Sequence, residues 1–161
     1  MKTYSFENLD VWKKSRELVV CVYNIQSCFP PFEKYGLGDQ LRRAVVSVSS
    51  NIAEGNARYS LKEQIHFIEI AIGSLMEVFC QLTLAYDLKY ITESQLNKCN
   101  EKIEIVLKLL NGLRYYKLKL LYPNTSKQSR SYVLKSPIPS TTIKFLKSNI
   151  NNHHTSYVTR Q

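Results

Sequence analysis

The sequence predicts an all-α protein: an antiparallel up-down-up-down four-helix bundle followed by a basic, largely disordered C-terminal tail. Apolar residues recur at steps of three and four along four long segments, which is the spacing of one helix face. The 161 residues include only 5 Gly and 5 Pro, too few for a turn-rich β fold. Short connections between such helices favour a bundle. We therefore expect a four-helix domain over residues 1–122 and a tail over residues 123–161.

The first helix is expected over residues 10–28, with Asp10 as its N-cap. Residues at helical spacing form its buried stripe: Val11, Ser15, Leu18, Val22 and Ile25. Pro30 and Pro31 end the helix, because proline lacks the amide hydrogen that a helix needs and restrains the residue before it. Residues 29–38 then form a connection.

The second helix is expected over residues 39–55, capped by Asp39, and it carries two stripes. The apolar stripe is Leu41, Val45, Val48 and Ile52, and the polar stripe is Arg43, Ser47, Asn51 and Glu54. This polar composition differs from the mixed Lys and Glu of a solvated face, so it predicts a hydrogen-bonded seam, within the bundle or between subunits. An exposed polar face is the alternative, because charged residues are rarely buried. Gly55 would end the helix through a left-handed turn.

The third helix is expected over residues 60–90 and opens with the capping-box spacing of Ser60 and Glu63. Its main stripe alternates steps of four and three: Leu61, Ile65, Ile68, Ile72, Leu75, Phe79, Leu82 and Tyr86. A second stripe beside it implies a second neighbour: Phe67, Ala71, Ser74, Val78, Gln81, Ala85 and Leu88. Gly73 in the middle costs on the order of 1 kcal/mol of helix propensity, and a close approach by another helix would explain it.

The fourth helix is expected over residues 93–122, behind a capping box of Thr92 and Gln95. Its buried face contains Leu96, Ile103, Leu107 and Leu110. Its end is basic and aromatic: Arg114, Tyr115, Tyr116, Lys117 and Lys119. These cations could contact phosphates, or they could simply complement the dipole at the helix C-terminus.

The net charge of +9 is unevenly placed along the chain. Residues 1–122 carry 16 Lys and Arg against 13 Asp and Glu, whereas residues 123–161 carry 6 Lys and Arg and no acid. A basic arm of this kind suits nucleic acid or another polyanion, because phosphate contacts release condensed counterions. The alternative is a solvated tail without a function, since termini are often disordered.

The sequence contains no recognisable catalytic or metal-binding motif. It has no glycine-rich phosphate loop, no Ser/His/Asp arrangement and no HExxH. Glu63 and His66 have the Glu-x-x-His spacing of di-iron bundles, but only one copy is present. We therefore expect no enzyme activity, no catalytic residue, no metal, no cofactor and no small-molecule substrate.

The remaining composition predicts a cytoplasmic protein that does not bind membranes. No apolar run approaches the roughly 20 residues that span a bilayer, and the N-terminus lacks the apolar region of a signal peptide. Cys21, Cys28, Cys80 and Cys99 form no CxxC pair and fall within helical patterns. We expect them to be small buried hydrophobes and not a disulfide framework.

Motifs in register over residues 9–92 point to a family. They comprise Leu9 to Ser15, Tyr23, Phe29-Pro30, Glu33 to Leu37, Gln40 to Ala44, Ser47 to Gly55, Arg58, Ser60, Phe67, Ala71 to Leu75, Glu77 and Gln81-Leu82. Together they resemble the four-helix-bundle proteins encoded in intervening sequences of bacterial 23S ribosomal RNA genes. The fourth helix fits by pattern only, and Ser49 stands where the family often has Pro, which removes a possible kink.

The resemblance implies a left-handed bundle that assembles into a homopentamer with a basic surface and no enzyme activity. It also implies a relation to the accessory variability proteins of diversity-generating retroelements, which bind a reverse transcriptase and nucleic acid. We therefore predict a nucleic-acid-binding homo-oligomer, with RNA as the expected ligand. The alternative is a pentameric retroelement scaffold that binds a reverse transcriptase and its template RNA.

Two sets of residues are assigned to these roles. The basic surface for RNA or DNA is expected to comprise Lys13, Lys14, Arg16, Arg42, Arg43, Arg58, Arg114, Lys117 and Lys119. The structural or oligomer seam is expected to comprise Trp12, Arg43, Ser47, Asn51, Glu54, Gly73 and Ser74. Replacing Glu54 by Ala would leave an arginine without its partner and would destabilise the bundle by a few kcal/mol if both side chains are buried.

Overall fold

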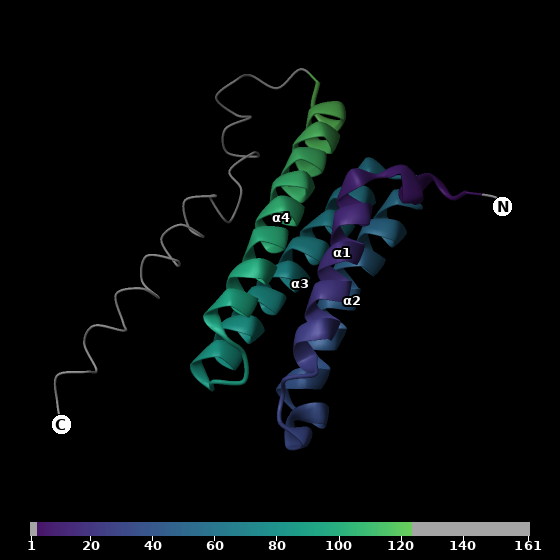
Figure 1. The fold of residues 1–161 in the computed structure, drawn as a ribbon. Coiled ribbons are helices and arrows are strands. Elements are labelled where there is room, and N and C mark those ends of the chain that lie inside the picture. Colours follow the sequence, from purple (N-terminus) through teal and green to yellow (C-terminus); the bar gives the residue numbers. More distant parts are fainter. Residues whose placement is uncertain (1–2, 124–161) are drawn as a thin grey trace. The chain divides into compact units, whose positions relative to one another are not determined.

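The computed structural model describes residues 3–123, and these residues form helices and no strand (Figure 1). The four long helices are α1 (Asp10–Gln26), α2 (Leu37–Asn56), α3 (Leu61–Asp87) and α4 (Glu93–Leu121). Two short 3-10 helices, η1 (Ser5–Asn8) and η2 (Pro31–Tyr35), precede α1 and α2. The all-α prediction is confirmed, and the predicted tail beyond Pro123 lies outside the described residues.

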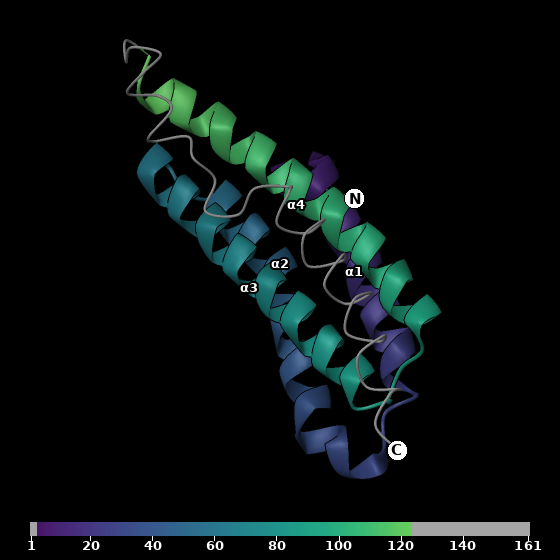
Figure 2. The ribbon, with the colours of Figure 1, turned by 90° about the vertical axis from the view of Figure 1, so that its left-hand side faces the viewer.

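The four helices alternate in direction and close into a bundle. Each helix packs against the next one in the chain, and α4 also packs against α1. Figures 1 and 2 show α4 beside both α1 and α3, with α2 on the far side. The up-down-up-down topology therefore brings the first and last helices together, although more than sixty residues separate them.

The buried core follows the predicted apolar stripes. The five residues of the predicted α1 stripe and the four of the α2 stripe are all buried. The largest fully buried side chains come from all four helices: Leu18, Leu41, Leu75, Leu82, Leu96, Ile103 and Leu110. Burying one such side chain contributes about 1.5–3 kcal/mol, so tertiary packing supplies most of the stability of these helices.

Helix α3 is buried on the two faces that contact α2 and α4. The buried residues include Ile65, Ile68, Leu75 and Val78, whereas Leu88 lies beyond the helix end and is exposed. By length and composition α3 could also cross a membrane, contrary to the expectation that no segment comes near this threshold. Two apolar stripes on one helix raise its mean hydropathy, and a core helix of a bundle needs both of them.

Helix α2 begins two residues earlier than predicted because Glu33 supplies the cap. The backbone N–H of Leu37 donates to Glu33 Oε2 at 2.7 Å, and Tyr90 OH donates to Glu33 Oε1 at 3.2 Å. Burial and this bond to Glu33 raise the pKa of Tyr90. Asp39, the predicted cap, lies in the first turn and pairs with Arg42 at 3.1 Å. One side chain of the loop thus ties the start of α2 to the turn between α3 and α4.

Other predicted helix ends are partly wrong. Asp10 is the first residue of α1 and makes no cap bond, and Ser60 caps α3 without a side-chain hydrogen bond. Gly55 lies inside α2 and has no positive φ, so it does not end the helix through a left-handed turn. The capping box of Thr92 and Gln95 is confirmed, with both reciprocal bonds present. Caps depend on local side-chain rotamers, which spacing alone does not determine.

Candidate nucleic-acid interface

Four of the nine predicted basic residues are arginines that pair with acidic side chains of the bundle: Arg42, Arg43, Arg58 and Arg114. Arg42 is only 27% exposed and donates to the carbonyl oxygen of Lys34 at 2.8 Å as well as to Asp39. Arg43 pairs with the other oxygen of Asp39 at 2.6 Å. The hydrogen bond from Arg42, followed by the charge of Arg43, holds the pKa of Asp39 below its usual value. These two arginines therefore stabilise the first turns of α2.

Two further arginines join neighbouring helices. Arg114 of α4 is 13% exposed, and its Nε and Nη2 donate to Glu69 Oε1 of α3 at 2.9 and 2.7 Å. Arg58 pairs with Glu54 of α2, and its guanidinium lies 4.8 Å from the ring centre of Phe67 of α3. Their cationic groups are thus occupied by contacts within the bundle.

The remaining predicted cations are closer to solvent. Lys14 pairs with Glu17 at 2.7 Å on the surface of α1. Lys117 and Lys119 lie in the final turns of α4, with Lys117 positioned 5.8 Å from the ring centre of Tyr116.

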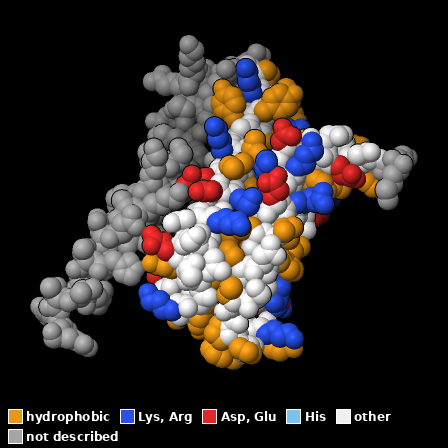
Figure 3. Space-filling model, in the orientation of Figure 1, with side chains coloured by type: hydrophobic (Ala, Val, Ile, Leu, Met, Phe, Trp, Pro, Cys, Tyr) orange, Lys and Arg blue, Asp and Glu red, His pale blue; other side chains and the backbone are white. Residues whose placement is uncertain are grey.

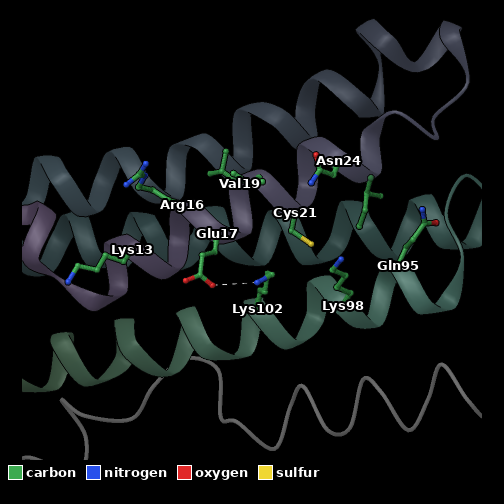
Figure 4. A pocket seen from close by; sticks show the side chains of 11 residues that line it. Lys13, Arg16, Glu17, Val19, Cys21, Asn24, Gln95, Lys98 and Lys102 are labelled. Atoms are coloured by element: carbon green, nitrogen blue, oxygen red, sulfur yellow. Dashed lines mark hydrogen bonds and ion pairs between the residues drawn. The ribbon is translucent and has the colours of Figure 1, made fainter.

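A groove lies between α1 and α4. Its volume is about 830 Å³. The α1 side provides Lys13, Arg16, Glu17, Val19, Val20, Cys21, Asn24 and Ile25, and the α4 side provides Gln95, Lys98 and Lys102. In Figure 4 Lys98 and Lys102 extend from α4 toward α1. We call this feature the α1/α4 groove.

The α1/α4 groove carries four cations and one carboxylate. Glu17 pairs with Lys102 across the groove at 3.5 Å and with Lys14 along α1 at 2.7 Å. The hydrogen bond from Lys14, with a smaller contribution from Lys102, lowers the pKa of Glu17. Arg16 lies over the ring of Trp12, 4.9 Å from its centre. Charged side chains of both signs gather on this face in Figure 3, so the positive charge is local to the groove.

Lys98 and Lys102 are groove residues that the sequence analysis did not select. They are four residues apart on α4, so they lie on the same helix face, beside the buried Cys99 and Ile103. The sequence shows that these two lysines share a helix face. It does not show that this face borders a groove, because the groove exists only where α4 packs against α1. Lys13 and Arg16 are the predicted residues that the structure brings to the same groove.

The predicted polar seam is formed only in its middle. Ser47 Oγ of α2 and Ser74 Oγ of α3 lie 2.9 Å apart, and Asn51 Nδ2 donates to Ser47 Oγ at 3.0 Å. Arg43 is 80% exposed and Glu54 is 50% exposed at their side chains, so neither is buried against α3 as expected. The reason is that the two charged residues lie toward the ends of the stripe, where Asp39 and Arg58 pair with them.

Gly73 is exposed on the outer surface of α3, and among residues 3–123 no other helix comes close to it. A Cβ atom added to Gly73 would meet no heavy atom within 4 Å. The same outward stripe of α3 carries Ile70, Glu77, Cys80 and Leu84, all exposed. The expected close helix approach is therefore not made by any of the helices that the structure describes. Trp12, by contrast, is half-buried and packs edge-on against Phe6, with ring centres 5.0 Å apart.

The described residues contain no cluster suited to a metal ion. Among residues 3–123, no three His, Cys, Asp or Glu side chains come together as metal ligands would. Glu63 and His66 are both exposed on α3.

Comparisons with known proteins give a consistent family. The family model described as "23S rRNA-intervening sequence protein" matches residues 7–112. A solved structure of a protein of unknown function from the S23 ribosomal protein family of Bacteroides thetaiotaomicron is similar in fold, with a TM-score of 0.60. It is 27% identical and covers 65% of this chain and 94% of its own. A search of curated proteins finds no significant match.

Proposed function

The chain belongs to the 23S rRNA-intervening sequence protein family, and from this starting point we propose that it is a non-enzymatic, nucleic-acid-binding homo-oligomer. RNA is the proposed ligand. The observation that carries the proposal is the α1/α4 groove, whose lining includes four cations, Lys13, Arg16, Lys98 and Lys102, and one acid, Glu17. The proposal assigns no catalytic residue and places the protein in the cytoplasm.

Phosphate binding in the groove is supported by its charge and by its shape. Lys13 and Arg16 lie on α1, whereas Lys98 and Lys102 lie on α4. Cations therefore line both walls of the groove. Side chains of this kind contact the phosphate backbone without reading the base sequence, which gives salt-dependent binding. The arginines buried against α2 and α3 contribute less, because their guanidinium groups already have partners.

Self-association is supported by the outer face of α3. Glycine at an exposed helix position costs about 1 kcal/mol relative to Ala, and no residue in the described part of the chain gives Gly73 a compensating close contact. Ile70 and Leu84 are 37% and 46% exposed on the same stripe. We propose that a second copy packs here, with Gly73 allowing the close approach and with a pentamer as the assembly that the family resemblance implies.

Salt-dependent binding to a labelled RNA hairpin tests the groove. The test variant is Lys98→Gln with Lys102→Gln, and the control is Lys62→Gln with Lys108→Gln, which removes two exposed lysines outside the groove. The test variant should bind more weakly and reduce the slope of log K against log salt by roughly 1.4–1.8, the value for two lost phosphate contacts. The control should keep the slope of the unmodified protein.

Equal slopes for the two variants would contradict the groove assignment. Binding would then be attributed to the basic segment over residues 123–161, which both variants retain. Light scattering of the same samples, with and without RNA, measures the assembly separately. A mass of one chain at all concentrations would contradict the homo-oligomer without affecting the groove result.

A retroelement accessory protein that binds a reverse transcriptase and its template RNA is the second proposal. It uses the same bundle and the same oligomer, and it differs in the protein partner. The gene neighbourhood separates the two: a ribosomal RNA operon supports the first, and a retroelement with a template repeat supports the second.

A further inference from the structure

Two cysteines from different helices meet at the α1/α4 groove, where Cys21 lines the groove and Cys99 lies buried behind it. Cys21 of α1 and Cys99 of α4 are both free, and their Sγ atoms lie 3.1 Å apart. Cys99 is fully buried, whereas Cys21 is 6% exposed and lines the groove. The other two cysteines, Cys28 and Cys80, are exposed, contrary to the expectation that all four are buried.

We infer that Cys21 and Cys99 form an oxidisable pair, a site at which a small disulfide compound converts two thiols into a bond between α1 and α4. A disulfide has an S–S length of about 2.05 Å, so the two sulfur atoms need to move together by about 1 Å. Small rotations about χ1 of the two cysteines can bring the Sγ atoms together by this amount, because α1 and α4 pack directly against each other. The inference does not depend on nucleic-acid binding.

The groove determines which sulfur reacts first. Cys21 lines the groove and is the more accessible of the two thiols, because it is 6% exposed whereas Cys99 is fully buried. Cys21 as thiolate attacks one sulfur of the reagent, forms a mixed disulfide and releases the first reagent thiol. Cys99 then attacks the Cys21 sulfur, and its proton passes to the departing reagent sulfur, which leaves as the second reagent thiol. In sum, two protein thiols and one reagent disulfide give one protein disulfide and two reagent thiols.

The surroundings of the pair set how readily it reacts. Burial, together with the hydrogen bond to Cys21, raises the pKa of the Cys99 thiol, which slows the second step. The positive charges of Lys102 and Lys98 act in the opposite direction on Cys99. The same lysines attract an anionic reagent such as glutathione disulfide into the groove. Burial and the raised pKa of Cys99 thus slow oxidation of the pair, whereas the nearby lysines favour reaction with a small anionic disulfide.

The test uses the full chain with Cys28→Ser and Cys80→Ser, which removes only the two exposed thiols. The protein is incubated with glutathione disulfide in mildly alkaline buffer, quenched in acid, alkylated in urea and weighed by intact mass spectrometry. The expected product has lost two hydrogens, carries no alkyl group and no glutathione, and runs as one chain on a non-reducing gel. The control adds Cys99→Ala and should give at most a glutathione adduct at Cys21.

Unfolding supplies the second measurement. The two cysteines are 78 positions apart in the sequence. In concentrated urea the unfolded chain therefore gives one thiol a much lower effective concentration at the other than the folded bundle does. The equilibrium constant for the internal disulfide, measured in glutathione redox buffers, should be at least about tenfold larger for the native protein. A stable mixed disulfide at Cys21, or thiols at Cys21 and Cys99 that stay free in native protein while Cys28 of the unmodified chain reacts, would overturn the inference. So would equal constants in the two states.

Discussion

The hydroxyl groups of Ser47 and Ser74 lie 2.9 Å apart and join α2 to α3 at the middle of the bundle. Ser47 also accepts a hydrogen bond from Asn51 one turn later. Small side chains at these positions let the two helices approach closely, and the shared hydrogen bond satisfies polar atoms that the contact removes from water. The pair therefore allows close packing of α2 against α3 and also provides hydrogen-bond partners for the two part-buried hydroxyl groups.

Ser74→Ala should lower the free energy of unfolding by about 0.5–1.5 kcal/mol, because it removes one partner of a part-buried hydrogen bond. Urea denaturation followed by circular dichroism measures the change. Ser49→Ala is the control, since Ser49 Oγ donates only to the carbonyl oxygen of Val46 on its own helix. If both variants lose the same free energy, the bond between α2 and α3 has no stabilising role.

Glu54→Ala should cost less than about 1 kcal/mol, in contrast with the larger loss expected for a buried pair. The side chains of Glu54 and Arg58 are 50% and 40% exposed, so water can solvate the arginine that remains. Arg58 also keeps its contact with the Phe67 ring. The measurement is the melting temperature, and a loss of several kcal/mol would indicate that another subunit buries the pair.

Gly55→Ala should destabilise the protein by about 1–3 kcal/mol, although alanine is the better helix former. A Cβ atom at this position would lie 2.8 Å from Cβ of Phe67, which is closer than real Cβ contacts allow. Helices α2 and α3 would have to separate locally. Urea denaturation again measures the effect, and an unchanged or increased stability would mean that the contact adjusts without strain.

Gly73→Ala should stabilise the isolated chain by up to about 1 kcal/mol, because the added methyl group meets nothing and improves helix propensity. Gly112→Ala is a matched control, since Gly112 is also helical and open. The mass of the assembly, measured by light scattering, should then differ between the two variants. Only Gly73→Ala should reduce the mass of the proposed assembly, and a full-size assembly in both variants would exclude Gly73 from the subunit contact.

Glu17→Gln should strengthen RNA binding and steepen its salt dependence by up to roughly 0.9, because it removes the acid that neutralises the groove. The lowered pKa of Glu17 means that its contribution to stability is present above the ordinary carboxyl pKa and is lost only as the pH falls through the lowered value. The assay at pH 7 therefore compares a fully ionised carboxylate with a neutral amide.

Glu63→Gln, which changes the net charge equally on an exposed site of α3, is the control for that measurement. An identical gain in both variants would assign the effect to net charge alone. A gain limited to Glu17→Gln would place the phosphates beside Lys102 and Lys14, the two partners of Glu17.

Much of the fold could be read from periodicity. The four helices, their order and most of the buried stripe residues agree with the structure, and so does the capping box of Thr92 and Gln95. The residues of the candidate site were predicted less accurately than the fold. Lys13 and Arg16 were selected, but Lys98 and Lys102 were missed. Arg42 and Arg114 were selected for charge, although their partners Asp39 and Glu69 engage them within the bundle.

The sequence by itself determined where the chain is helical and which face of each helix is apolar, because both follow from interactions within a few residues. Only the tertiary structure decided that Cys21 meets Cys99, that Lys102 faces Glu17 and that Ser47 meets Ser74. Such pairs depend on the axial register and rotation of one helix against another. These are set jointly by the close packing of all buried side chains, and no single segment encodes them.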